Sequence, residues 1–104
     1  MLHPDLKSFI SKESVRLKQS FPMDDAQEIL ARTVKLSEEL GELSSNVLSH
    51  LSYQRHDKPK ITTSDLSHEF ADVIITALLL AESLDIDISK ALMEKTKKID
   101  ERYA

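Results

Sequence analysis

The sequence contains no cysteine and no tryptophan, and only one glycine and three prolines among its 104 residues. Without cysteine the chain forms neither disulfides nor cysteine-ligated zinc sites, which suits a reducing compartment such as the cytoplasm. So little glycine and proline leaves few turn signals, and strand-like alternation of apolar and polar residues is missing as well. These absences favour an all-α fold.

A long apolar run is also missing. The longest stretch, residues 73–81, is broken by Thr76 and is far shorter than the ~20 residues that a membrane-spanning helix needs. The first residues lack a basic segment followed by an apolar one, so no signal peptide is expected. The net charge of −4 gives no general attraction to nucleic acid. We therefore expect a cytoplasmic protein that binds neither membranes nor nucleic acid.

Helical periodicity predicts four helices in a single domain, at residues 4–20, 24–53, 62–84 and 87–102. Short connections between such helices favour an antiparallel four-helix bundle. The third helix is apolar nearly all round, which indicates burial on most sides. A chain of this size buries a limited share of its surface. We therefore expect a homo-oligomer, either a dimer or a tetramer.

Capping signals mark where the later helices begin. Asp24 with Gln27, and Thr62 with Asp65, have the spacing of capping boxes. Asp87 precedes the fourth helix and is suited to be its N-cap.

Two pairs of acidic residues stand inside otherwise apolar helical stretches. Glu39 and Glu42 are three residues apart in the second helix, and Glu69 and Asp72 are three apart in the third. This spacing places each pair on one helix face, with Cβ atoms about 5–6 Å apart. Like charges so close repel each other, and we expect no local basic residue to neutralise either pair. The pattern therefore indicates a cation between the carboxylates.

Asp72 directly precedes the apolar run, so we expect it near the core. A lone buried carboxylate is costly, whereas several that converge on a hard cation are not. Ligand sets made only of oxygen suit Mg²⁺ or Mn²⁺. From the residues alone, a solvated acidic surface remains an open alternative.

A di-iron carboxylate bundle is a competing interpretation, because such sites also lie between helices. They require glutamate followed three residues later by histidine on two helices. Here Glu39 is followed by Glu42, Glu69 by Asp72, and no glutamate of the chain has a histidine at that spacing. The residues therefore favour Mg²⁺ and phosphate chemistry over iron redox chemistry.

Gly41 is the only glycine, and it lies inside the second predicted helix, where it costs up to about 1 kcal/mol relative to alanine. We expect another backbone or a ligand to pack closely against it, and a neutral choice is the alternative. In the fourth helix, Lys95 and Arg102 are seven residues apart and share one face. They are candidates for phosphate contacts, with a solvated face as the alternative.

The order of these motifs resembles the MazG-like nucleoside triphosphate pyrophosphohydrolases. That family carries Glu-Glu-x-x-Glu, a variable gap, and then Glu-x-x-Asp. The matching segments here are residues 35–43 (KLSEELGEL), 69–75 (EFADVII) and 84–88 (LDIDI), followed by Lys95 and the pair at 102–103. The resemblance covers residues 32–103.

The resemblance implies an all-α nucleoside triphosphate (NTP) pyrophosphatase fold, in a dimer or tetramer whose active sites are helped by a neighbouring subunit. It implies hydrolysis of an NTP or dNTP to the monophosphate and pyrophosphate, dependent on Mg²⁺ with Mn²⁺ as a possible substitute. The metal ligands that it implies are Glu39, Glu42, Glu69 and Asp72.

The resemblance also implies roles outside the metal site. Glu38 would orient or deprotonate the attacking water, and Lys35, Lys95 and Arg102 would contact the triphosphate. The chain departs from many relatives at Ile99, where they carry asparagine. Contacts from the fourth helix to the base or sugar are therefore in doubt.

Aromatic side chains that could stack on a base are scarce. The candidates are Phe9, Phe21, Tyr53 and Tyr103, whereas Phe70 is expected in the core. Two alternatives to a house-cleaning NTP pyrophosphohydrolase stay open. One is a phosphoribosyl-ATP or dUTP pyrophosphohydrolase with the same metal site. The other is a non-catalytic oligomeric helical module that binds metal or nucleotide.

Overall fold

The computed structural model describes residues 1–51 and 61–104, which form helices and, within these two ranges, no strand. The helices are α1 (Pro4–Ser20), α2 (Asp25–His50), α3 (Thr63–Ser83) and α4 (Ile88–Glu101). The all-α class is confirmed, and the predicted helix boundaries agree to within about three residues at each described end. Tyr53, where we expected the second helix to end, lies outside the described residues.

The N-terminal caps explain why the helices begin where they do. Asp24 and Gln27 form a reciprocal capping box before α2, and Thr62 and Asp65 form another before α3. Asp87 accepts a hydrogen bond of 3.1 Å from the backbone N–H of Lys90 at the start of α4. Each cap satisfies backbone donors that the first helical turn leaves without partners.

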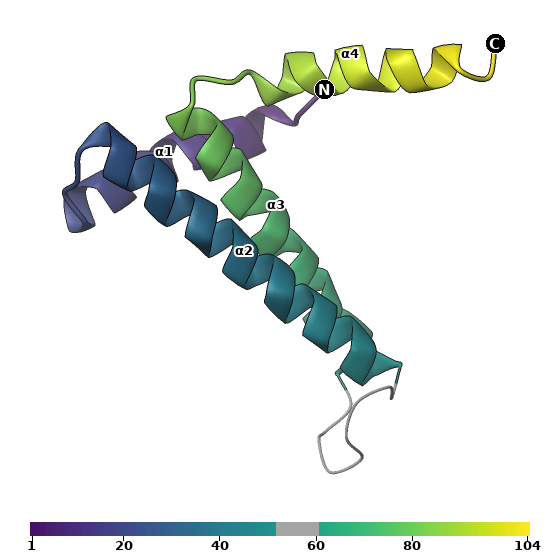
Figure 1. Cartoon of the computed structure of the whole chain (residues 1–104), viewed down its shortest axis with the longest axis horizontal. Coiled ribbons are helices and arrows are strands. Elements are labelled where there is room, and N and C mark those ends of the chain that lie inside the picture. Colours follow the sequence, from purple (N-terminus) through teal and green to yellow (C-terminus); the bar gives the residue numbers. More distant parts are fainter. Residues whose placement is uncertain (52–60) are drawn as a thin grey trace.

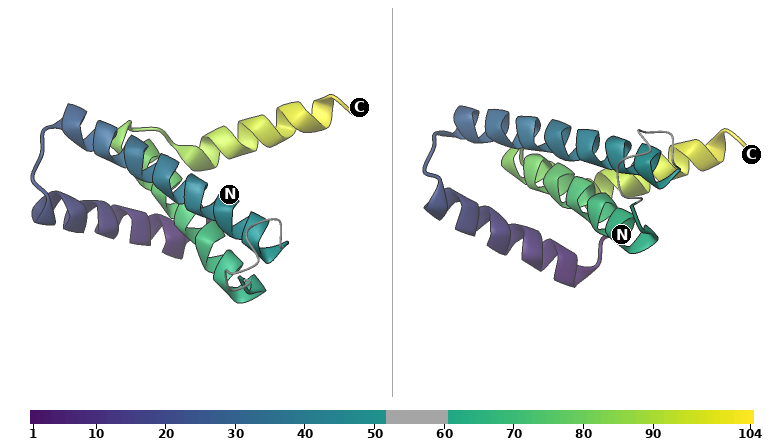
Figure 2. Two further views of the ribbon diagram at one scale, coloured as in Figure 1. Left: turned by 60° about the horizontal axis from the view of Figure 1, so that its bottom comes forward. Right: turned by 90° about the horizontal axis from the view of Figure 1, so that it is seen from below.

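α2 and α3 run antiparallel, side by side along most of their length (Figure 1). α1 packs against the C-terminal half of α3, and Figure 2 shows α1 and the projecting part of α4 extending in different directions from it. The core between α1 and α3 is small and consists of Ile10, Leu78 and Leu79, with half-buried apolar neighbours around them. The C-terminal half of α3 is therefore the well-covered half.

α4 projects away from the other three helices in both Figures 1 and 2. Its first turn is held by Ile88, which packs on the core, and by Ser89, whose Oγ accepts a 3.2 Å hydrogen bond from the backbone N–H of Leu2. Residues 90–104 are exposed. Within one chain, α4 therefore does not lie alongside the other helices as an antiparallel four-helix bundle requires.

The N-terminal half of α3 is more exposed than its sequence predicts. Phe70 and Ile74 are each 52% exposed, and Asp72 is exposed as well. The expectation that Phe70 and Asp72 lie near the core is wrong for a single chain. In the part of the chain that the structure describes, α2 packs along this half of α3, whereas α1 packs near Leu78 and Leu79. No helix in the described ranges is both long and apolar enough to cross a membrane.

Candidate metal centre and its cavity

The antiparallel packing of α2 and α3 brings acidic residues of the two helices together. Glu39, Glu69 and Asp72 each offer a carboxylate oxygen, and these atoms lie within 4.8 Å of one another. Glu39 is buried, Glu69 is half-buried and Asp72 is exposed. The two helices thus bring three carboxylates to one place, although Glu39 is 30 or more residues from the other two in sequence.

Two oxygens of this cluster are buried without a hydrogen-bond donor among the described residues, namely Glu39 Oε2 and Glu69 Oε2. A buried carboxylate oxygen without a partner costs free energy, which a cation at that place would remove. The ligand set holds oxygen only, the chemistry that Mg²⁺ and Mn²⁺ prefer. The residues therefore fit a hard divalent cation.

Glu42 lies at the edge of this cluster and is exposed. Its pKa is raised above the ordinary value, first by the negative charge of Glu39 and then by partial desolvation and the charge of Glu69. Glu42 therefore shares the electrostatic field of the cluster, although it does not belong to the trio of closest oxygens.

Lys35 lies one helical turn before Glu39 and contacts it. Its Nζ is 3.1 Å from Glu39 Oε1 and 3.7 Å from Glu38 Oε1. The hydrogen bond to Glu39, with the charges of Glu38 and Glu39, raises the pKa of Lys35. The expectation that no local basic residue neutralises the acids is wrong for the pair on α2, because i,i+4 residues on a helix face each other.

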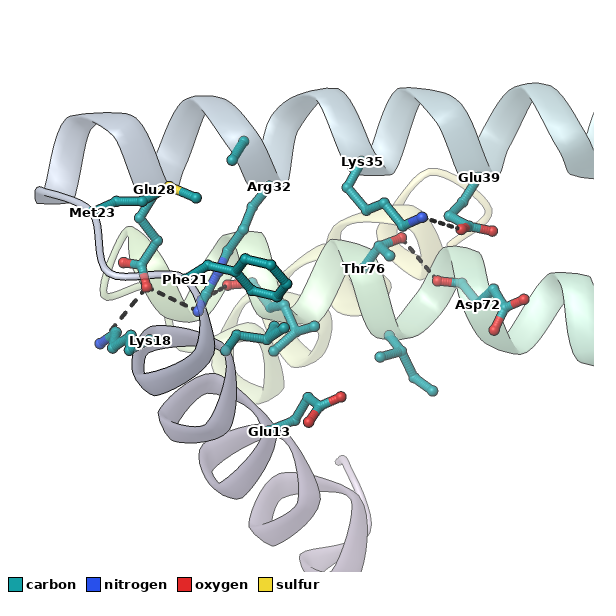
Figure 3. A pocket seen from close by; sticks show the side chains of 14 residues that line it. Glu13, Lys18, Phe21, Met23, Glu28, Arg32, Lys35, Glu39, Asp72 and Thr76 are labelled. Atoms are coloured by element: carbon teal, nitrogen blue, oxygen red, sulfur yellow. Dashed lines mark hydrogen bonds and ion pairs between the residues drawn. The ribbon is translucent and has the colours of Figure 1, made fainter.

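A cavity of about 520 Å³ opens beside the acids, between α1, α2 and α3. Lys35, Glu39 and Asp72 line one end, as Figure 3 shows. Phe21 and Met23, in the connection from α1 to α2, line the other end. Volumes of this size are typical of small-molecule sites.

The wall of the cavity contains a buried arginine that the sequence analysis did not single out. Arg32 donates to Leu79 O (2.8 Å) and to the Oγ of Ser14 (3.0 Å), a residue that is itself fully buried. It also forms ion pairs with Glu28 (2.9 Å) and Glu82 (3.0 Å). These contacts link α1, α2 and α3 around one guanidinium group.

A signal for Arg32 was present in the sequence. Arg32, Leu36, Glu39 and Leu43 follow one another at spacings of four, three and four residues, which is the inward face of α2. Arg32, Glu39 and Leu43 are buried there, and Leu36 is half-buried. A basic residue on the apolar face of a helix therefore indicated a buried charge network.

The network sets the ionisation of Glu82. Burial by itself raises the pKa of this carboxyl group, but the hydrogen bonds from Ser14 and Arg32, with the charges of Lys18 and Arg32, outweigh it. The pKa of Glu82 is therefore held below its ordinary value. The ionised form is the one that the fold stabilises.

The remaining candidates do not belong to the trio of Glu39, Glu69 and Asp72 within a single chain. Lys95 and Arg102 are exposed on the projecting α4 and do not line the cavity. Apart from its chain neighbours and the backbone of its own helix, a Cβ atom added to Gly41 would meet no described atom within 4 Å. The close packing that we expected at this glycine therefore does not occur among the described residues of one chain. Glu38 is exposed beside Lys35.

The chain is similar in sequence to known proteins. Uncharacterized protein YpjD of Bacillus subtilis (strain 168) is 38% identical over 65 residues, a segment that covers 60% of this chain and 55% of that relative. The chain thus spans about half the length of the curated relative it matches. No solved structure gives a significant match. The model of the MazG nucleotide pyrophosphohydrolase domain matches residues 27–104, which include all the acids of the cluster, and the chain therefore belongs to this family.

Proposed function

We propose that the protein is a Mg²⁺-dependent pyrophosphohydrolase, with Mn²⁺ as an alternative ion, that converts an NTP or dNTP to the monophosphate and pyrophosphate. The observation that carries the proposal is the gathering of carboxylate oxygens from Glu39, Glu69 and Asp72 within 4.8 Å at one end of a cavity of about 520 Å³. The setting that we propose is nucleotide-pool house-cleaning in the cytoplasm.

Glu39, Glu42, Glu69 and Asp72 would hold the metal. When bound, it neutralises phosphate charge and lowers the pKa of a coordinated water. Glu38 is the proposed base, because it lies next to Glu39 and is exposed to solvent. In the reaction, the water oxygen bonds to the α-phosphorus and its proton passes to this base. The bond from the α-phosphorus to the bridging oxygen breaks, and pyrophosphate leaves with the electron pair.

The cavity offers distinct surroundings for the two parts of a nucleotide. At the acidic end Lys35 supplies a cation for the phosphates, and at the far end Phe21 and Met23 supply apolar surface for the nucleoside. Charged groups at one end and apolar groups at the other match an amphipathic ligand. The orientation that we propose places the triphosphate on the acids and the base toward the α1–α2 connection.

A homodimer or homotetramer belongs to the same proposal. Leu40 of α2 and Phe70 and Ile74 of α3 are each about half exposed, close in sequence to the acids. Burial of such apolar side chains is the main driving force for association. A second copy on this face would also bring basic residues that the single chain keeps far from the acids. In this arrangement Lys95 and Arg102 of the partner subunit would contact the triphosphate.

The direct test is hydrolysis of the eight common NTPs and dNTPs with Mg²⁺ or Mn²⁺, followed as phosphate released by an added inorganic pyrophosphatase. We expect turnover of at least one nucleotide and none in the presence of a chelator. Absence of turnover across the panel would refute the proposed enzymatic activity and favour a non-catalytic module that binds metal or nucleotide. Including dUTP and phosphoribosyl-ATP separates the related pyrophosphohydrolases, because a strong preference for either would replace the house-cleaning role.

A further inference from the structure

We propose that Lys35 is a competing cation of the metal centre, which occupies Glu39 until a divalent ion displaces it and then turns to the substrate phosphates. The inference rests on the proposed metal site and adds a positioning residue to it. Three features of the structure support it, namely the state of the two Glu39 oxygens, the freedom of the Lys35 side chain, and its place in the cavity.

The two oxygens of Glu39 differ in their surroundings. The Glu39 side chain is only 10% exposed, and its Oε1 is 3.1 Å from Lys35 Nζ. Its Oε2 is buried and has no donor among the residues that the structure describes. Lys35 therefore compensates one oxygen of a carboxylate whose other oxygen is buried without a donor, in the same cluster as Glu69 and Asp72. A divalent ion that binds all three acids competes with the ammonium group for Glu39.

The Lys35 side chain is less constrained than that of Arg32 on the same helix. Lys35 is 53% exposed, and its recorded partners, Glu38 and Glu39, both lie on α2 itself. Arg32 is held by groups of α1 and α3 as well. A lysine ammonium on a flexible stem exchanges partners at little cost, whereas a fixed guanidinium does not.

The position of Lys35 gives the released ammonium a second partner. Lys35 lines the cavity together with Glu39 and Asp72, on the side that leads toward Arg32 and Phe21. A triphosphate bound at the acids would extend along this wall. The same side chain would therefore oppose the metal in the free protein and support the phosphates in the complex. A lysine that only stabilises α2 would do neither.

The experiment measures Mn²⁺ binding to the metal-free full chain, without nucleotide, by calorimetry or electron paramagnetic resonance. We expect Lys35→Met to bind Mn²⁺ about 3- to 10-fold more tightly than the unmodified chain, because a competing ion pair is removed. Lys35→Arg, which retains the charge, should stay close to the unmodified chain. The matched control is Lys18→Met, which loses the same charge at the far end of the cavity, where Lys18 Nζ is 4.0 Å from Glu28.

A gain in Lys35→Met that Lys18→Met does not share supports the inference. Equal affinities in Lys35→Met and the unmodified chain, or equal gains in both methionine variants, would overturn it while leaving the proposed function intact. Absence of Mn²⁺ binding in all variants, together with absence of nucleotide turnover, would refute the proposed function itself. If the protein turns over nucleotide, Lys35→Met should bind Mn²⁺ more tightly but show a higher KM for the preferred nucleotide, because the phosphates lose a cation.

Discussion

Two charged clusters lie on the inward face of α2, one around Arg32 and one around Glu39, seven residues later. They differ in whether a fixed cation compensates the buried carboxylates. The guanidinium of Arg32 has hydrogen-bond or ion-pair partners on α1, α2 and α3. Glu28 Oε1 is buried without a hydrogen-bond donor, but it lies 2.9 Å from this guanidinium. Around Glu39, three carboxylates converge, and two of their oxygens are buried without donors. The Arg32 cluster is suited to hold the helices together, because its ion pairs and hydrogen bonds join all three. The Glu39 cluster is suited to bind a cation, because its unpaired buried oxygens cost stability until one binds.

Of the substitutions suggested by this comparison, one in the acidic cluster should have the largest effect, and it should fall on activity. Asp72→Asn should lower turnover at least about 1,000-fold, because the metal stabilises transition-state charge by several kcal/mol and each 1.36 kcal/mol is a factor of ten. The helical circular dichroism spectrum should be unchanged, since Asp72 is exposed. Asp25→Asn, an equal charge change in the first turn of α2, is the control. Near-normal turnover of Asp72→Asn would remove this residue from the metal ligands.

At the other cluster the effect should fall on stability. Arg32→Met removes the cation nearest to Glu28 and Glu82 and leaves them with the more distant Lys18. We expect a loss of about 2–4 kcal/mol in the free energy of unfolding in urea, below the value for a fully buried pair because the Glu82 side chain is 36% exposed. Arg16→Met is the control, because its 2.8 Å ion pair with Glu13 is at the surface. Equal losses in the two variants would show that burial does not distinguish them.

The smallest expected effect is on the pH dependence of stability. Glu82 in the Arg32 cluster and Glu42 beside Glu39 should change the stability with opposite signs. The pKa of Glu82 is lowered in the fold, so its contribution is present above the ordinary value of 4.5 and is lost as the pH falls through the folded pKa. The pKa of Glu42 is raised, so its ionised form opposes folding, and that opposition disappears as the pH falls through its folded pKa toward 4.5.

Metal-free urea titrations between pH 3 and pH 7 would measure both slopes. Glu82→Gln should unfold more easily than the unmodified chain at pH 7 and lose less stability on acidification. Glu42→Gln should be slightly more stable at pH 7, and the difference should vanish at acidic pH. If Glu42→Gln were less stable than the unmodified chain at pH 7, the repulsion from Glu39 would not be the dominant influence on Glu42.

The helices and their caps followed from local sequence signals. The capping boxes at Asp24 and Thr62 occur as their spacing predicts, because a cap involves only residues three positions apart. The pairing of Lys35 with Glu39 was equally local, and i,i+4 spacing could have revealed it. Arg32 could have been noticed on the inward face of α2, but its partners on α1 and α3 could not, because they are distant in sequence.

The exposure of the third helix was not predictable in the same way. An all-round apolar helix indicates burial but does not identify the surface that covers it. Among the described residues of one chain, α2 packs along the half that contains Phe70 and Asp72, and Phe70 remains 52% exposed. The basic residues of the fourth helix were identified from the sequence. The projection of α4 from the other helices was not, because helical periodicity does not specify which surface a helix packs against. The close packing expected at Gly41 also depended on a neighbouring surface, and among the described residues of one chain there is none.

The sequence by itself determined an all-α chain, the caps that begin its helices and the two acid pairs, because each depends on interactions within about one helical turn. The order of those motifs also pointed to the family. Only the tertiary structure decided that Glu39 meets Glu69 and Asp72, that a cavity adjoins them, and that Arg32 joins α1 to the wall of that cavity. These features require the packing of helices from distant parts of the chain, which no local pattern specifies.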